Sequence, residues 1–226
     1  MKPYYLAASL ICGNPLSIRE EIALLVKGDI DYLHFDVMDG VFVPRYGLYP
    51  EVLAAIRSIT DLPIEVHMMT EEPERYVADF AKAGATFISV HAEACKHLHH
   101  TLKVIREHGM KAGVVLNYAT PLTVLDYILD DVDMVMLMAI NPGIVGHKLI
   151  PGTIKKIGDL RQRIDNSAHD ILLAIDGGVS PESASNMISA GTNYLVCGTS
   201  SIYKSDMPLD VKIGEFRNLI DRALAE

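Results

Sequence analysis

The sequence has no tryptophan, only three cysteines and few aromatic residues, which make up 7% of its 226 residues. Cys12, Cys95 and Cys197 lack the close spacing of metal-binding cysteines and cannot pair as an even set of disulfides, so a reducing compartment is expected. No uncharged run is long enough to span a bilayer, and the apolar stretch before Cys12 is too short for a signal peptide. We therefore expect a cytoplasmic protein without a membrane partner, whose N-terminal stretch is the first strand of the fold.

Basic residues are also scarce, with 20 Lys and Arg against 29 Asp and Glu and a net charge of −9. This acidic balance, with a pI near 5.4, argues against a nucleic-acid partner. Half of the residues are hydrophobic and the mean hydropathy is +0.21, so the chain can bury a large core. The length favours one domain over residues 1–226 rather than two small ones.

Short β-rich runs alternate with segments of helical spacing along the whole chain. The predicted strands are Tyr5–Ser9, Tyr32–Asp36, Ile64–His67, Thr86–His91, Lys111–Leu116, Met134–Met138, Ile171–Ile175 and Tyr194–Cys197. The predicted helices cover residues 50–59, 73–83, 98–108, 121–129, 154–164, 183–190 and 211–224. Eight strands, each followed by a helix, predict an α/β fold of the (β/α)₈ TIM-barrel type. A doubly wound sheet is the alternative, but no Gly-rich turn follows the first strand.

Ionisable side chains gather at the ends of three predicted strands. His34 and Asp36 are two residues apart on one strand and therefore point the same way. His67 ends the next strand, and Asp176 follows the seventh. Active residues of a barrel lie at the carboxyl ends of its strands, so these four groups predict a divalent-metal site whose carboxylates could also move protons. His91 also ends a strand and could be a further ligand, but we favour a packing role for it.

Glycine-rich turns follow the sixth, seventh and eighth strands. Glycine lets the main chain approach an anion closely, and the last two loops are the usual phosphate site of such barrels. The predicted phosphate-binding residues are Gly143, Ile144, Val145, Gly146, Gly177, Gly178, Gly198 and Thr199.

Taken together, these motifs resemble the ribulose-phosphate 3-epimerase family over nearly the whole chain. The residues that carry the resemblance are Ser9, His34-x-Asp36-x-Met38-Asp39-Gly40, Glu65-Val66-His67-x-Met69, Asn141-Pro142-Gly143, Asp176-Gly177-Gly178-Val179 and Gly198-Thr199.

The resemblance implies one divalent metal ion (Zn²⁺, Fe²⁺, Mn²⁺ or Co²⁺) held by His34, Asp36, His67 and Asp176. The metal would stabilise the enediolate formed when C3 of a ketose phosphate loses its proton. Asp36 and Asp176 would act as acid and base on opposite faces, and the sequence does not assign which serves which face. The substrate would also contact Ser9, His67, Met38, Met69 and Met138. On the residues alone, core packing is the favoured interpretation of the methionines, and a turn or cap role is the favoured interpretation of Ser9.

Three departures from the family pattern concern the substrate. Val145 and His147 alter the glycine loop after the sixth strand, and Arg45 stands where the family usually has asparagine. Thr199 replaces the usual serine, a mild change also seen in relatives that act on allulose 6-phosphate. We favour the interconversion of D-ribulose 5-phosphate and D-xylulose 5-phosphate. D-allulose 6-phosphate is the alternative substrate, and a sugar-phosphate-binding protein without turnover is a third interpretation. A barrel decarboxylase is disfavoured because no lysine lies among the inward-pointing residues of the second and third predicted strands. The resemblance also suggests a homo-oligomer.

Overall fold

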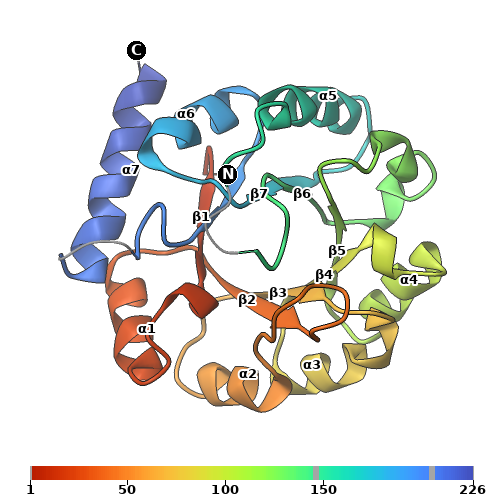
Figure 1. Cartoon of the computed structure of the whole chain (residues 1–226), viewed down its shortest axis with the longest axis horizontal. Coiled ribbons are helices and arrows are strands. Elements are labelled where there is room, and N and C mark those ends of the chain that lie inside the picture. The colour runs from red at the N-terminus through yellow and green to blue at the C-terminus, as the bar shows by residue number, and fades with distance from the viewer. Residues whose placement is uncertain (1, 145–147, 204–206, 226) are drawn as a thin grey trace.

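The computed structural model describes residues 2–144, 148–203 and 207–225. In these residues eight parallel strands pair in chain order and β8 closes onto β1, which makes the barrel of Figure 1. The strands are β1 Tyr5–Ser9, β2 Tyr32–Met38, β3 Ile64–Met69, β4 Phe87–His91, β5 Lys111–Leu116, β6 Met134–Met138, β7 Leu172–Asp176 and β8 Tyr194–Cys197. The predicted (β/α)₈ fold is confirmed, and the N-terminal stretch is its first strand.

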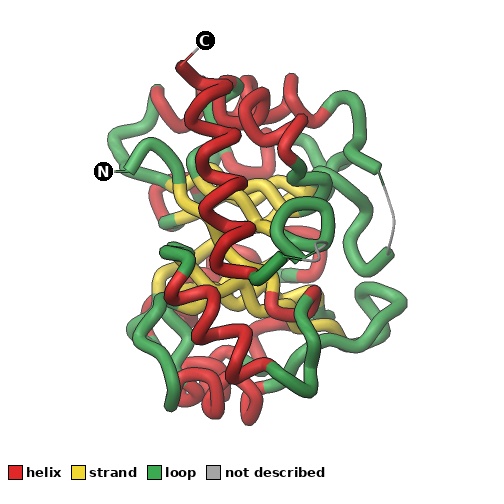
Figure 2. The backbone as a smooth tube through the Cα atoms, turned by 90° about the vertical axis from the view of Figure 1, so that its left-hand side faces the viewer, coloured by secondary structure: helices red, strands yellow, loops and turns green. Residues whose placement is uncertain are grey.

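Helices surround the strands, as Figures 1 and 2 show from two directions. They are α1 Ile18–Lys27, α2 Pro50–Arg57, α3 Val77–Ala83, α4 Leu98–Glu107, α5 Thr153–Asp165, α6 Pro181–Ser189 and α7 Leu209–Ala225. No helix in the described ranges is long and apolar enough to cross a membrane.

The predicted helices differ from the structure in three places. The helix predicted over 121–129 is wrong: two 3₁₀ turns, Leu122–Leu125 and Leu129–Asp131, follow β5 instead. The β-branched Thr123 and Val124 disfavour an α-helix there. The segment 73–83 begins as a separate 3₁₀ turn before α3. The predicted set also lacks α1, although its buried Ile22 and Leu25 have the spacing of a helix face.

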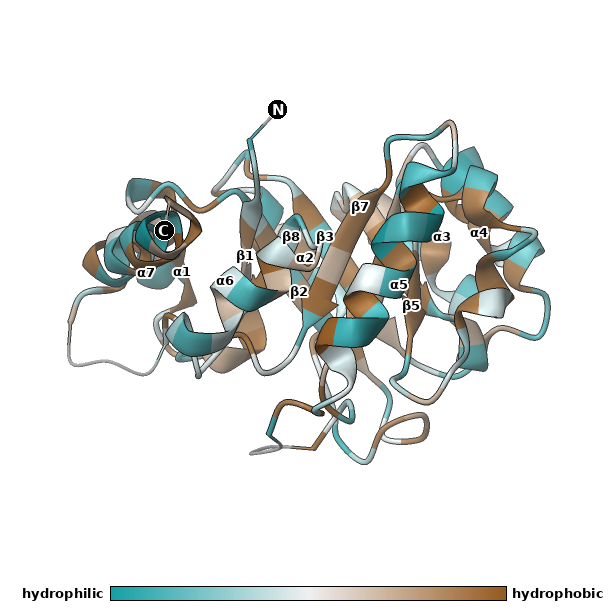
Figure 3. Ribbon diagram, turned by 90° about the horizontal axis from the view of Figure 1, so that it is seen from above, coloured by the Kyte–Doolittle hydropathy of each residue, from teal (hydrophilic) through white to brown (hydrophobic). Residues whose placement is uncertain are grey.

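Two apolar layers hold the barrel together. The larger layer packs the outward faces of the strands against the helices. The smaller layer fills the barrel itself and includes Phe87, Met134, Met136 and Tyr194. Figure 3 accordingly shows apolar strands at the centre and hydrophilic residues on the surrounding helices. The barrel is therefore a packed core rather than a pore, and polar side chains inside it must find partners among themselves.

The alternation of side chains along β2 decides what enters this interior. Tyr32 contacts the aromatic rings of the inner layer, so the residues at steps of two from it, His34, Asp36 and Met38, point inward as well. Both β2 and β3 run two residues beyond their predicted ends, to Met38 and Met69. Asp36 and His67 consequently lie within paired strands, where the backbone holds them firmly.

Candidate metal centre and active site

Strand register brings the four predicted ligands together. Asp36 of β2 lies opposite His67 of β3, while His34 lies opposite Glu65. Asp176 ends β7, next to Met138 of the neighbouring strand β6, and faces the histidines from across the barrel. One ligand atom from each of the four residues lies within 4.8 Å of the others.

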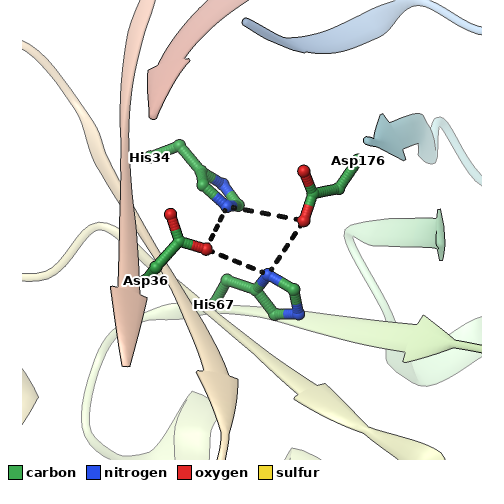
Figure 4. A group of neighbouring side chains, drawn as sticks. All are labelled: His34, Asp36, His67 and Asp176. Carbon is green, nitrogen blue, oxygen red and sulfur yellow. Dashed lines mark hydrogen bonds and ion pairs between the residues drawn. The ribbon is translucent and has the colours of Figure 1, made fainter. Parts of the chain in front are cut away.

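The four groups form a ring in which nitrogen and oxygen atoms alternate (Figure 4). Nε2 of His34 is 3.1 Å from Oδ1 of Asp36 and 4.0 Å from Oδ2 of Asp176. Nδ1 of His67 is 3.6 Å and 3.4 Å from the same two oxygens. Each carboxylate therefore turns one oxygen toward both imidazoles, and the two carboxylates stand at opposite corners.

Burial and charge act against each other in this cluster. Burial alone lowers the pKa of His34, but the carboxylates of Asp36 and Glu65 outweigh it and raise the pKa well above its ordinary value. Burial likewise lowers the pKa of His67, and the nearby carboxylates of Asp176 and Asp36 raise it to about 9. Burial alone raises the pKa of Asp36, yet the two imidazoles bring it well below its usual range. The carboxylates thus favour positive charge at the centre of the ring.

The donor set fits a divalent metal ion. Nδ1 of His67 is buried and has no hydrogen-bond partner, although it points toward two carboxylates. An ion bound at about 2.1 Å holds neighbouring tetrahedral ligands about 3.4 Å apart, close to the separations around this ring. Two imidazole nitrogens and two carboxylate oxygens suit several first-row divalent metals, so the ring could hold a metal without selecting one.

Three residues behind the ring were not identified from the sequence as part of the site. Nδ1 of His34 meets Oε2 of Glu65, which is fully buried. Nε2 of His67 lies 2.9 Å from Nε2 of His91, and Nδ1 of His91 lies 3.2 Å from Oε2 of Glu93. The packing role predicted for His91 is therefore incomplete, because its ring connects a metal-site histidine to a carboxylate. The available signal was the step of two that joins Glu65 to His67 and His91 to Glu93.

A cavity of about 320 Å³ opens above the ring at the carboxyl ends of the strands. This volume is at the small end of the range for sites that enclose a metabolite. Asp36 and Asp176 reach the cavity, whereas His34 and His67 lie fully buried beneath it. The predicted contact residues that line it are Ser9, Met38, Met69, Met138, Gly143, Ile144, Gly177, Gly178, Gly198 and Thr199.

Ser9 acts on the site through a carboxylate. Its hydroxyl donates a 2.8 Å hydrogen bond to Oδ2 of Asp36, the oxygen that faces away from the imidazoles. The two oxygens of Asp36 thus have different surroundings, one in the ring and one with Ser9. Met38 and Met69 form a small apolar cluster with Val43, so these side chains both fill space and line the cavity.

The turn after β7 requires glycine. Gly177 has φ +93°, and a Cβ atom there would lie 2.3 Å from the Ile140 side chain. Gly178 has φ +65°, so both residues adopt the left-handed conformation that other residues rarely take. The predicted phosphate residues Val145 and Gly146 lie outside the described residues. Arg45 also lines the cavity, which brings a cationic side chain to the entrance of an acidic site.

The amino-acid sequence of this chain is similar to those of known proteins. The family model described as "Ribulose-phosphate 3 epimerase family" matches residues 5–203. The chain belongs to this family. Family membership makes it a carbohydrate epimerase, an enzyme of the isomerase class.

Relatives from bacteria and plants cover most of the chain. The "Ribulose-phosphate 3-epimerase" of Bacillus subtilis is 46% identical over 201 residues, which cover 88% of this chain and 93% of the relative. The Escherichia coli K12 protein of the same name is 40% identical over 227 residues, which cover 100% and 97%. A chloroplastic relative from Arabidopsis thaliana is 42% identical over 206 residues and covers 90% of this chain, with 73% of its own length matched.

Solved structures of other proteins share the fold at low sequence identity. KGPDC from Streptococcus mutans has a TM-score of 0.76 and 14% identity and covers 98% of this chain and 99% of its own. A 3-hexulose-6-phosphate synthase has a TM-score of 0.66 and 16% identity, with 96% and 99% covered. These likenesses show the barrel alone.

Proposed function

We propose that this chain interconverts D-ribulose 5-phosphate and D-xylulose 5-phosphate by inverting C3. The observation that carries the proposal is the pair of carboxylates, Asp36 and Asp176, at opposite corners of one buried ring beneath a cavity. The names of the relatives that match this chain support the choice of substrate.

Inversion needs a proton to leave one face of C3 and another to arrive at the opposite face. The ring uses only one oxygen of each carboxylate, so the second oxygen of Asp36 and of Asp176 can serve the substrate. One aspartate takes the C3 proton as base while the other gives a proton as acid, and the roles exchange in the reverse reaction. The hydroxyl of Ser9 holds the free oxygen of Asp36 in place for this transfer.

Four residues would hold the metal ion: His34, Asp36, His67 and Asp176. When bound, a divalent ion supplies Lewis-acid stabilisation of the negative charge that develops next to C3. We propose Zn²⁺, Fe²⁺, Mn²⁺ or Co²⁺, because each accepts mixed imidazole and carboxylate ligands.

The remaining contacts position the substrate. Met38, Met69 and Met138 present apolar surface beside the reacting carbons and keep water away from them. The phosphate group would lie at the turns that contain Gly177, Gly178 and Gly198, with the loop of Gly143 and Ile144 beside them. We further propose that residues 1–226 act as one catalytic domain, which the closure of β8 onto β1 supports. Self-association and a cytoplasmic location stay predictions of the sequence.

Proton NMR in D₂O tests this function directly. Protein reconstituted with Zn²⁺, Mn²⁺ or Fe²⁺ is given D-ribulose 5-phosphate, and D-allulose 6-phosphate in a parallel sample. We expect loss of the C3 proton signal and appearance of D-xylulose 5-phosphate, with a higher rate for the pentose phosphate. Faster turnover of the hexose phosphate would reassign the substrate, and the absence of C3 exchange with both would refute the epimerase assignment.

A further inference from the structure

His67 faces the ring of ligands with Nδ1, so its other nitrogen, Nε2, points away from the site and toward His91. The ring planes of the two histidines differ by 22° and their centroids are 5.1 Å apart, which lets the 2.9 Å contact join ring edges. We propose that His91 and Glu93 are positioning residues that determine which nitrogen of His67 carries hydrogen and so keep Nδ1 free for the metal ion. This inference rests on the proposed metal centre.

The direction of each hydrogen bond in the series His67, His91 and Glu93 follows from its last member, Glu93. A carboxylate can only accept, so Nδ1 of His91 must donate to Oε2 of Glu93. Nε2 of the neutral His91 ring is then an acceptor, and Nε2 of His67 must donate to it. A histidine that binds a metal is a neutral imidazole with hydrogen on one nitrogen only, so in the metal-bound form Nδ1 of His67 keeps its lone pair for the metal ion.

The orientation of Glu93 is set by the loop after β5. Its other oxygen, Oε1, accepts a 2.9 Å hydrogen bond from the backbone N–H of Asn117 and a second from the hydroxyl of Thr120. Lys156 of α5 donates to the backbone oxygens of Asn117 and Thr120 at 2.8 Å and 2.7 Å, which fixes the loop. A helix on the outside of the barrel thus connects through a series of hydrogen bonds to a buried metal ligand.

The second histidine has a simpler arrangement, which supplies a matched control. Nδ1 of His34 donates directly to Oε2 of Glu65, while Oε1 of Glu65 has no hydrogen-bond partner among the described residues. A glutamine at position 65 could therefore turn its amide oxygen toward His34 and preserve the direction of the bond. A glutamine at position 93 could not, because Asn117 and Thr120 require an oxygen at the Oε1 position and leave the amide NH₂ facing His91.

The test compares metal affinity in two isosteric variants, Glu93→Gln and Glu65→Gln. Cobalt affinity is measured by competition with a chelator, using the visible absorption of bound Co²⁺. We expect Glu93→Gln to weaken binding by about 10- to 100-fold, the usual effect of disturbing a partner of a metal-bound histidine. Glu65→Gln should weaken it by less than about threefold, because the direction of its hydrogen bond is kept. Distance from the metal site alone would predict the larger loss of affinity for Glu65→Gln, because Glu65 contacts His34 directly whereas Glu93 reaches His67 only through His91.

Two further measurements separate this inference from loop disruption and from misfolding. Thr120→Val removes one donor to Glu93 but keeps its carboxylate, so its cobalt affinity should match that of the wild type. ¹⁵N NMR of the wild-type Zn²⁺ form should place hydrogen on Nε2 of His67 and on Nδ1 of His91. Hydrogen on Nε2 of His91, or equal losses of affinity in the two glutamine variants, would overturn the inference. A wild-type chain that binds no cobalt would instead refute the metal centre on which it rests.

Discussion

Asparagine substitutions at the two aspartates should separate proton removal from inversion. Asp36→Asn and Asp176→Asn keep the shape of the side chain but remove its ability to take a proton. Because the carboxylates stand at opposite corners of the ring, each is expected to serve one face of C3. A variant with one remaining aspartate can still remove the C3 proton from that face and return a deuteron to it, without inverting the carbon.

The expected size of the effect follows from the role of each group. Loss of one general acid or base costs about 10²- to 10⁴-fold in turnover, or about 2.7–5.4 kcal/mol in activation free energy. Both aspartates also contribute an oxygen to the ring, so the assays use saturating metal and bound metal is measured in each variant. In the Asp36→Asn variant the amide oxygen can keep the ring position, with the NH₂ group donating to the hydroxyl of Ser9, which can accept a hydrogen bond as well as donate one.

The assay follows deuterium incorporation at C3 with each pentulose phosphate supplied separately. We expect each variant to form the other epimer about 10²- to 10⁴-fold more slowly than the wild type. One variant should exchange only D-ribulose 5-phosphate and the other only D-xylulose 5-phosphate. If both variants exchange the same epimer, or if either one epimerises within about tenfold of the wild-type rate, the two-carboxylate mechanism is wrong.

Three other predictions follow from the same geometry. Removal of metal by a chelator should abolish turnover and lower thermal stability, by about 4 kcal/mol if the metal was present at about 1,000 times its Kd, and added Mn²⁺ or Zn²⁺ should restore both. Gly177→Ala should weaken the binding of inorganic phosphate, and in calorimetric unfolding it should destabilise the fold more than Gly109→Ala does. Both glycines have positive φ, but only at position 177 would a Cβ atom clash, with the side chain of Ile140. Equal losses of unfolding free energy in the two variants would contradict this. Burial raises the pKa of Glu93, but its hydrogen bonds lower it to about 2, so its stabilising effect is complete above its unfolded pKa of about 4.3 and is lost as the pH falls toward 2. Urea unfolding of the metal-free protein should therefore show a larger difference between wild type and Glu93→Gln at pH 5 than at pH 3.

Much of the barrel could be predicted from local patterns. The strands Tyr5–Ser9, Lys111–Leu116 and Met134–Met138 agree with the structure at both ends. A fully buried parallel strand is a short apolar run between turn residues, which is a strong local signal. The segment after β5 was the weak case, because its apolar spacing suits a helix while its β-branched residues disfavour one.

The ligand residues were predicted because their types and their places at strand ends are visible in the chain. His34 and Asp36 share one strand face by the step of two alone. Their meeting with Asp176, which lies five strands further along the chain, depends on closure of the barrel, since only then does β7 face β2 and β3. The resemblance to a family already implied that these residues hold one metal ion, but the physical cause of their meeting is the closed sheet.

The kinds of groups present and the strands that carry them could thus be predicted from composition and from periodicity over a few residues. The partners of those groups follow from the closed barrel. The contact between His67 and His91 joins different strands, and the donors that orient Glu93 come from the loop after β5. Such pairings depend on strand register and side-chain direction in three dimensions, which no local pattern encodes. The steps of two in the chain point to Glu65 and Glu93, but that Glu65 bonds His34 and that Glu93 connects through His91 to His67 follows from the folded barrel.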